Sequence, residues 1–121
     1  MTMYQMWHLM RSKYGSKITE VDGQKFHSKK EANRWCELKL RERAGEISDL
    51  RRQVPYEILL AVRWEGKTLR IRSYTADFVY RETSSGDIIV EDVKGYRTPL
   101  YLLKRQMFLH HHGDKLRFIK T

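Results

Sequence analysis

Cysteine and long apolar runs are the scarcest features of this 121-residue sequence. Its single cysteine, Cys36, has no partner for a disulfide within the chain, which excludes the disulfide framework of small secreted domains. No apolar run approaches the roughly 20 residues that a transmembrane helix requires. The first residues lack an uninterrupted apolar stretch and a small-residue cleavage site, so we expect no signal peptide. These absences favour a reducing, cytoplasmic setting without a membrane partner.

The sequence also lacks internal repeats and the motifs of several enzyme classes. There is no Cys/His spacing typical of zinc sites, no glycine-rich loop to cradle a phosphate, and no Ser-His-Asp arrangement. The three consecutive histidines at 110–112 diverge by about 100° each on a helix and cannot all bind one ion. The length fits one domain. We expect residues 1–121 to form a single domain, with residues 1–13 as an N-terminal arm that is flexible or exchanged within a dimer.

Basic residues are in excess along the whole chain. Lysine and arginine number 24 against 15 aspartates and glutamates, and the formal net charge is +9. An excess of this size favours a polyanionic partner, above all a nucleic acid, because lysine and arginine make the phosphate contacts. Hydrophobic residues make up 40 % of the chain, which is enough for one modest core and too much for a disordered protein.

Hydrophobic spacing and turn residues predict an α/β fold. Asp22-Gly23 favours a hairpin over residues 18–26. Ser28 is the expected N-cap of a helix that ends at Gly45, with apolar residues at helical spacing as far as Leu40 and Ala44. The remaining elements are a helix from Thr98-Pro99 and strands at 53–64, 68–74, 76–81, 87–94 and 115–119. The predicted architecture is a mixed central β-sheet flanked by helices.

Two of the expected strands carry carboxylates among apolar neighbours. Asp77 lies within residues 74–80, and Asp92 lies within residues 88–95. A carboxylate in such surroundings is costly unless it is paired or binds a metal. Because side chains alternate along a strand, Asp92 and Lys94 share one face. If the strand that carries Asp77 is a neighbour, two carboxylates and a lysine converge.

Such a group of side chains suits phosphodiester chemistry. Carboxylate oxygens favour Mg²⁺, with Mn²⁺ as a substitute, while waters and a substrate phosphate complete the octahedron. The metal polarises the phosphoryl oxygen, and a lysine orients or deprotonates the attacking water. The competing interpretation is structural: Asp77 accepts a hydrogen bond at a strand end, and Asp92 and Lys94 form a surface pair of little energetic worth.

On these residues the sequence resembles the PD-(D/E)XK nuclease superfamily, which contains restriction enzymes and Holliday junction resolvases. The resemblance is greatest to short phage-type endonucleases, with SKKEA at residues 28–32 and EDVKG at residues 91–95. It spans roughly residues 13–113. It implies a restriction-endonuclease-like core and hydrolysis of DNA, with branched DNA such as a four-way junction as the substrate. Ala76 replaces the proline of the family name, which is a backbone preference and not a ligand.

The resemblance also implies residue roles. The catalytic residues would be Glu31, Asp77, Asp92 and Lys94, and one or two Mg²⁺ ions would be held by Glu31, Asp77, Asp92 and the carbonyl of Val93. From spacing alone, Ser28-x-x-Glu31 is a capping box, so Glu31 remains open to both interpretations. Glu91 faces the other side of the strand and is a second-tier candidate.

Weaker candidates for DNA contacts are Arg51, Arg52, Gln53, Arg97 and Lys104. A resolvase cuts two strands symmetrically, so we expect a homodimer, acting in the host cytoplasm if the protein is phage-encoded. Two alternatives stay open. One is a non-catalytic nucleic-acid-binding protein without a metal requirement, and the other is a nicking or restriction-type nuclease that acts on linear duplex.

Overall fold

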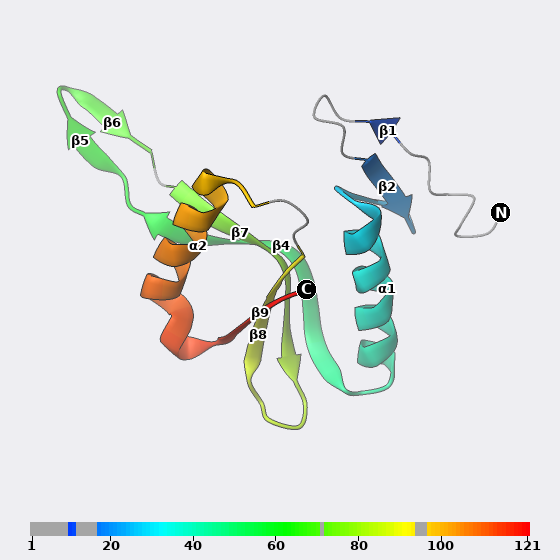
Figure 1. Cartoon of the computed structure of the whole chain (residues 1–121). Helices are drawn as coiled ribbons and strands as arrows, with labels where there is room; N and C mark the ends of the chain where they lie inside the picture. Colours follow the sequence, from blue (N-terminus) through cyan, green and yellow to red (C-terminus); the bar gives the residue numbers. More distant parts are fainter. Residues whose placement is uncertain (1–9, 12–16, 71, 94–96) are drawn as a thin grey trace. The chain divides into compact units, whose positions relative to one another are not determined.

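The computed structural model describes residues 10–11, 17–70, 72–93 and 97–121 (Figure 1). The chain divides into two compact units, Met1–Ala44 and Gly45–Thr121. Each unit contains one α-helix and its own small sheet or sheets. No helix in the described part of the chain is long and apolar enough to span a membrane. The expectation of a single nuclease domain stays a prediction.

The first unit opens with a small antiparallel sheet in the order β1-β2-β3. These strands are β1 (Met10–Arg11), β2 (Lys17–Val21) and β3 (Gln24–Phe26). Asp22 and Gly23 both have positive φ and form the tight turn between β2 and β3, as predicted. β1 falls within the predicted arm of residues 1–13, and the rest of that arm lies outside the described residues.

The helix α1 (Lys29–Arg43) begins where the sequence predicts. The side chain of Ser28 accepts a hydrogen bond from the backbone N–H of Glu31 at 3.1 Å, and Ser28 is therefore the N-cap. Gly45, with a φ of +80°, follows the end of the helix. Glycine adopts this left-handed conformation without steric cost, which explains why the helix stops here.

The buried face of α1 contains Leu38 instead of the expected Leu40. Trp35 is buried, and its ring centroid lies 6.1 Å from that of Phe26 in β3. Leu38 is also buried, whereas Leu40 is 62 % exposed. Leu38 follows Trp35 by three residues and shares its face, whereas Leu40 follows by five residues and turns away. The prediction that Leu40 belongs to the apolar face is therefore wrong.

The second unit is built on a mixed four-stranded sheet in the order β4-β7-β8-β9. The strands are β4 (Ile47–Leu59), β7 (Arg72–Glu82), β8 (Ile88–Asp92) and β9 (Arg117–Lys120). β7 is antiparallel to both β4 and β8, whereas β8 and β9 are parallel. The predicted α/β class and mixed sheet are confirmed. The finer likeness to a nuclease core stays a prediction.

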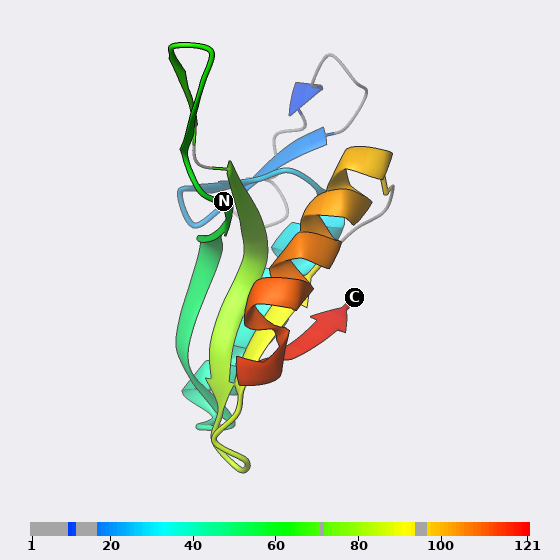
Figure 2. The same cartoon turned by 90° about the vertical axis from the view of Figure 1, so that its left-hand side faces the viewer.

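The helix α2 (Pro99–His112) connects the parallel strands and lies along one face of the sheet (Figure 2). Thr98 caps it by accepting a hydrogen bond from the backbone N–H of Tyr101 at 3.1 Å, and Pro99 occupies its first turn, as predicted. The short 3-10 helix η1 (Gly113–Lys115) then leads into β9. The core between α2 and the sheet consists of Ile58, Tyr74, Ala76, Val79, Val90 and Phe108.

A separate hairpin interrupts the connection from β4 to β7. It consists of β5 (Val62–Trp64) and β6 (Lys67–Leu69), and it projects away from the four-stranded sheet (Figure 1). The predicted strand at 53–64 is therefore wrong, because β4 ends at Leu59 and β5 is a new strand. The predicted strand at 68–74 is also wrong, because it joins the end of β6 to the start of β7. The predicted strand at 76–81 is too short, because β7 runs from Arg72 to Glu82.

β4 begins at Ile47, well before the predicted start at residue 53. The register against β7 shifts between Ser48 and Arg51, and Asp49 between them has a φ of +55°. A bulge of this kind breaks the two-residue alternation that identifies a strand in a sequence. The irregularity explains why the sequence pattern does not show the first part of β4.

Candidate active site

Asp77 and Asp92 lie on neighbouring strands. β7 and β8 pair with Phe78 opposite Glu91 and with Val79 opposite Val90. The same antiparallel register, continued by one residue, brings Asp77 and Asp92 to neighbouring positions at the ends of the paired segments. Both carboxylates are buried, with exposures of 4 % and 0 %. The adjacency that the sequence analysis expected is present, and the role of the pair in catalysis stays a prediction.

Asp77 accepts hydrogen bonds at both of its carboxylate oxygens. The backbone N–H of Val93 donates to Oδ2 at 2.7 Å, and the side-chain amide of Gln53 donates to Oδ1 at 3.3 Å. Hydrogen bonds from an N–H group to a carboxylate favour its charged form and fix its orientation. Gln53 is predicted as a DNA contact, but its amide is directed at Asp77 in the structure. In the sequence, the position of Gln53 beside two arginines is the only feature that marks it as a candidate.

The sheet is irregular at this point. Gln53, which the β4–β7 register sets opposite Asp77, has a φ of +52°. A residue with a side chain rarely adopts this left-handed conformation, and such strain is concentrated at functional sites. On β7, Tyr74, Ala76 and Val79 all belong to the core under α2. In a regular strand residues 76 and 79 would point to opposite faces, so the alternation of side chains is interrupted between them, beside Asp77. The carboxylate pair therefore sits where the regular sheet geometry breaks.

Asp92 is contacted from α2. The hydroxyl of Tyr101 donates a hydrogen bond to Asp92 Oδ2. Burial, then the hydrogen bond to Asp92 and its charge, raises the pKa of Tyr101 well above its ordinary value. Burial, followed by the negative charge of Asp92, raises the pKa of Tyr74 in the same way. Both phenols therefore keep their protons at neutral pH, and Tyr101 remains a donor to the carboxylate.

A pocket of about 230 Å³ adjoins these two tyrosines. It is lined by Ser73, Tyr74, Thr75, Thr98, Leu100, Tyr101 and Lys104. Lys104, a candidate from the sequence, is half-buried there. The guanidinium of Arg105 lies 5.7 Å from the centre of the Tyr101 ring. Two cations thus flank the carboxylate side of α2, where they suit a phosphate group.

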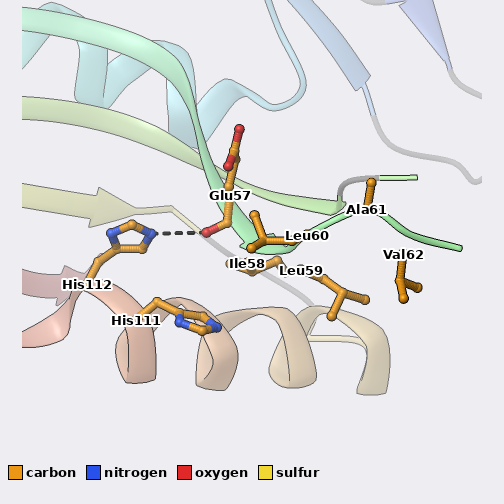
Figure 3. Close-up of a pocket in the computed structure, with 8 residues that line it drawn as sticks. All are labelled: Glu57, Ile58, Leu59, Leu60, Ala61, Val62, His111 and His112. Atoms are coloured by element: carbon orange, nitrogen blue, oxygen red, sulfur yellow. Dashed lines mark hydrogen bonds between the residues drawn. The ribbon is translucent and has the colours of Figure 1, made fainter. Parts of the chain in front are cut away.

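The larger pocket shown in Figure 3 lies elsewhere in the second unit. It has a volume of about 660 Å³ and is lined by the end of β4, the first residue of β5 and the last turn of α2. His112 Nε2 lies 3.1 Å from the carbonyl oxygen of Glu57, and the other lining residues are mostly aliphatic. Neither Asp77 nor Asp92 lines it, so it is not a site for the chemistry predicted from the sequence.

Two predicted catalytic residues lie outside the described part of the second unit. Glu31 is buried in α1 of the first unit, with an exposure of 3 %. Its backbone N–H is bonded to Ser28, which confirms the capping role of Ser28. A place for the Glu31 side chain in a metal site stays a prediction. Lys94 lies outside the described residues.

Glu91 is separated from the site by the sheet itself. It pairs with Phe78, on the face opposite to that of Asp92. It is fully buried, and it accepts hydrogen bonds from the hydroxyl of Tyr80 at 2.8 Å and from that of Thr121 at 3.3 Å. This arrangement agrees with its second-tier rank in the sequence analysis.

The remaining predicted DNA contacts lie on β4 and before α2. Arg51 is exposed and pairs with Val79, whereas Arg52 is half-buried and pairs with Phe78. Consecutive strand residues point to opposite faces, so these two arginines do not form one patch. Arg97 is exposed ahead of α2. Contacts of any of them with DNA stay predictions.

The donor set of the carboxylate pair fits a hard divalent cation. Across the described residues, no group of three or more histidine, cysteine, aspartate or glutamate side chains could hold a metal ion. Mg²⁺, however, is usually bound through one or two carboxylates, with waters and substrate phosphates as its other ligands. Asp77 and Asp92 meet that requirement. The carbonyl of Val93 as a further ligand stays a prediction.

These features define an α/β protein in which two buried carboxylates lie on neighbouring, paired strands of a mixed sheet. The chain belongs to the family described as "Protein of unknown function (DUF1064)", whose model matches residues 11–121. Comparisons with curated proteins and with solved structures gave no match. Since the family description names no activity, the function has to follow from the chemistry of the site.

Proposed function

We propose that the protein is a metal-dependent endonuclease that hydrolyses phosphodiester bonds in DNA, with branched DNA such as a four-way junction as its substrate. The observation that carries this proposal is the pair of buried carboxylates, Asp77 and Asp92, on adjacent strands. Two buried carboxylates at neighbouring positions of adjacent strands repel each other unless a cation or a proton intervenes. In a chain with a net charge of +9, such a pair is best explained by a cation that it shares with a phosphate.

The proposed cofactor is Mg²⁺, with Mn²⁺ as a substitute. Asp77 and Asp92 supply its oxygen ligands, and Glu31 and the Val93 carbonyl are the further candidates. When bound, Mg²⁺ supplies Lewis-acid chemistry, since it polarises a phosphoryl oxygen and lowers the pKa of a bound water. The order of an aspartate followed by Asp-x-Lys, through which the sequence resembles the PD-(D/E)XK nucleases, supports this choice of cofactor.

The residues around the pair have distinct tasks in this proposal. The Val93 amide and Gln53 hold Asp77 in one orientation, and Tyr101 does the same for Asp92. Groups whose positions are set before the substrate binds need no reorganisation during the reaction. Lys94, by the resemblance, orients the attacking water. Lys104 and Arg105 on α2 flank the site and suit a neighbouring phosphate.

The proposal includes a homodimer. A four-way junction has two-fold symmetry, and its resolution requires cuts in two strands at matching positions. The Asp77–Asp92 pair of one protomer makes one cut, and the same pair of a second copy supplies the second cut. Sedimentation of the protein on a junction tests this point, and a single protomer bound to a junction that is cut symmetrically would contradict it.

The proposed activity is tested with a labelled four-way junction and a matched linear duplex, each with Mg²⁺ and with EDTA. We expect Mg²⁺-dependent cutting of the junction at symmetric positions. Asp92→Asn and Asp77→Asn should each slow cutting by at least about a hundredfold, the typical loss when one charge-stabilising group is removed. Both variants should bind DNA as well as the wild type or better, because a negative charge has been removed.

Asp87→Asn is the matched control, since Asp87 is an exposed carboxylate just before the same strand. It should cut at the wild-type rate. Equal cutting of junction and duplex would retain the nuclease and discard the preference for branched DNA. Tight binding of both DNAs without cutting would favour the non-catalytic nucleic-acid-binding protein. Unchanged cutting by Asp92→Asn would show that the site is assigned to the wrong residues.

A further inference from the structure

The β5–β6 hairpin has an apolar face that is left open. Val62 pairs with Leu69 and Trp64 pairs with Lys67, so these four side chains share one face. Three of them are apolar, and Val62, Trp64 and Leu69 are 54 %, 61 % and 46 % exposed. A two-stranded hairpin is at best marginally stable in water and needs its apolar face covered. The four-stranded sheet does not cover this one, because the hairpin projects away from it (Figure 1).

The same hairpin is strongly basic. Residues 61–72 contain four basic residues and one acidic residue, a net charge of +3. Arg63, Lys67, Arg70 and Arg72 are all exposed. On the polar face, Arg63 donates hydrogen bonds to Thr68 Oγ1 at 2.9 Å and to a carbonyl in the turn at 3.2 Å, which braces the hairpin. The remaining guanidinium donors of Arg63 stay available to a ligand.

We propose that this hairpin, named here the basic arm (residues 61–70 and 72), grips the DNA substrate. Trp64 stacks on bases exposed at a branch point, and the exposed arginines and lysine contact backbone phosphates. Charge selects this partner, because DNA is a polyanion, whereas a second copy of the chain brings an arm and a total charge of the same sign. The shape also suits DNA, since a two-stranded β-ribbon fits the major groove.

The basic arm gives a structural reason for a preference for branched DNA. In a linear duplex each base is stacked between its neighbours, so Trp64 has no free base face to meet. At a fork or a junction the bases at the branch point are exposed, and aromatic side chains stack on such bases. The proposal rests on the proposed function for the identity of the partner as DNA, and it adds the residue that distinguishes branched from linear DNA.

The first test measures binding in EDTA, where no cutting occurs, to a four-way junction, a forked duplex and a linear duplex. Trp64→Ala should weaken binding to the junction and the fork by about 5- to 150-fold, the effect of losing one stacked base. Binding to the linear duplex should change much less. Trp64→Phe should retain the affinity, whereas Trp64→Leu should lose it, because leucine is apolar but offers no aromatic face.

Leu40→Ala is the matched control, since Leu40 on α1 is exposed to the same degree as Trp64, at 62 %. It should bind all three DNAs like the wild type. Lys67→Gln and Arg70→Gln test the phosphate contacts. Each should weaken binding to all three DNAs alike, and each should lower the slope of log Kd against log salt by about one.

Several outcomes would contradict the proposed role of the basic arm in DNA binding. Wild-type binding by Trp64→Ala would do so, as would full affinity of Trp64→Leu, which would make the face an ordinary apolar contact. Conversion of a dimer to a monomer by Trp64→Ala would show that a second copy covers the face instead. If Trp64→Ala alters the fold of the hairpin, the comparison of Trp64→Phe with Trp64→Leu still decides.

This test separates the two proposals. If the protein binds branched DNA through Trp64 but never cuts it with Mg²⁺, the proposed endonuclease activity is contradicted and the proposed DNA contact of the basic arm is retained. If DNA cutting depends on Asp92 but DNA affinity is unchanged in Trp64→Ala, only the proposed role of the basic arm is contradicted.

Discussion

Two antiparallel strand pairs of the second unit show opposite patterns of burial. In the β7–β8 pair, the carboxylates of Asp77 and Asp92 are buried among apolar side chains. In the β5–β6 hairpin, all six strand residues are exposed, including Trp64. Each pair reverses the usual rule that charged groups face water and apolar groups avoid it. Natural proteins break such local rules mainly at functional sites, and the two pairs are accordingly the proposed catalytic and DNA-gripping parts.

The largest expected effect concerns the core that holds α2 beside the carboxylate pair. Phe108 is fully buried, and its ring centroid lies 4.6 Å from that of Tyr74 and 5.0 Å from that of Tyr56. Phe108→Ala should lower the free energy of unfolding by about 3–5 kcal/mol in urea denaturation. Leu103→Ala, at a 55 % exposed position on the same helix, should change it by less than about 0.5 kcal/mol. Equal losses in the two variants would contradict the packing of α2 on the sheet.

A smaller effect is expected from the hydrogen bond between α2 and Asp92. Tyr101→Phe removes the donor to a fully buried carboxylate. The free energy of unfolding should fall by about 1–3 kcal/mol, the usual cost of leaving a buried polar group without its partner. Tyr56→Phe is the control, because Tyr56 packs on Phe108 through its ring. If the free energy of unfolding in urea falls equally in both variants, the hydrogen bond from Tyr101 to Asp92 does not contribute the expected stability.

The third effect is confined to alkaline solution. The pKa values of Tyr74 and Tyr101 are raised above their ordinary 10.0, chiefly by burial. Above about pH 10 the unfolded chain loses these protons while the folded chain keeps them, so the free energy of unfolding falls as pH rises. Below about pH 10 the contribution is fully present.

The measurement is the urea midpoint at about pH 8 and at about pH 11, with tyrosinate absorbance recorded in parallel. Tyr74→Phe should lose less stability between these two pH values than the wild type does. Ionisation of all tyrosines in a chain that is still folded would contradict the raised pKa values.

The smallest effect is expected at the hairpin. Trp64→Ala should change the free energy of unfolding by less than about 0.5 kcal/mol, because Trp64 is 61 % exposed. The same urea titration used for Phe108→Ala measures it, with Trp64→Phe as the control. A loss of more than about 2 kcal/mol would mean that the side chain is covered in solution. The contrast between the two strand pairs would then fail.

The sequence predicts some elements well and others poorly, for local reasons. The caps of both helices and the Asp22-Gly23 turn are correct, because each depends on contacts within three or four residues. The break between β4 and β5 is missed, because Leu60 and Ala61 carry no turn signal. The start of β4 is missed because its bulge at Asp49 interrupts the strand pattern.

The candidate site is likewise predicted in part from the sequence and missed in part. Asp77 and Asp92 stand out in the sequence as acids in apolar strands, and the structure places them on neighbouring, paired strands. Gln53 and Tyr101 are distant in sequence from the carboxylates they contact, and no local pattern links either to its partner. A search for the site by sequence spacing therefore finds the two carboxylates but not the side chains that orient them.

The sequence by itself determined the helix caps, the tight turn, the excess of positive charge and the presence of carboxylates in apolar strands. Each of these follows from residue chemistry and from neighbours a few positions away. Only the tertiary structure decided that the strands of Asp77 and Asp92 pair, that Glu91 and Asp92 lie on opposite faces and that the hairpin projects with Trp64 exposed. These features depend on strand register and on packing between distant segments, where a shift of one residue would move every side chain to the other face.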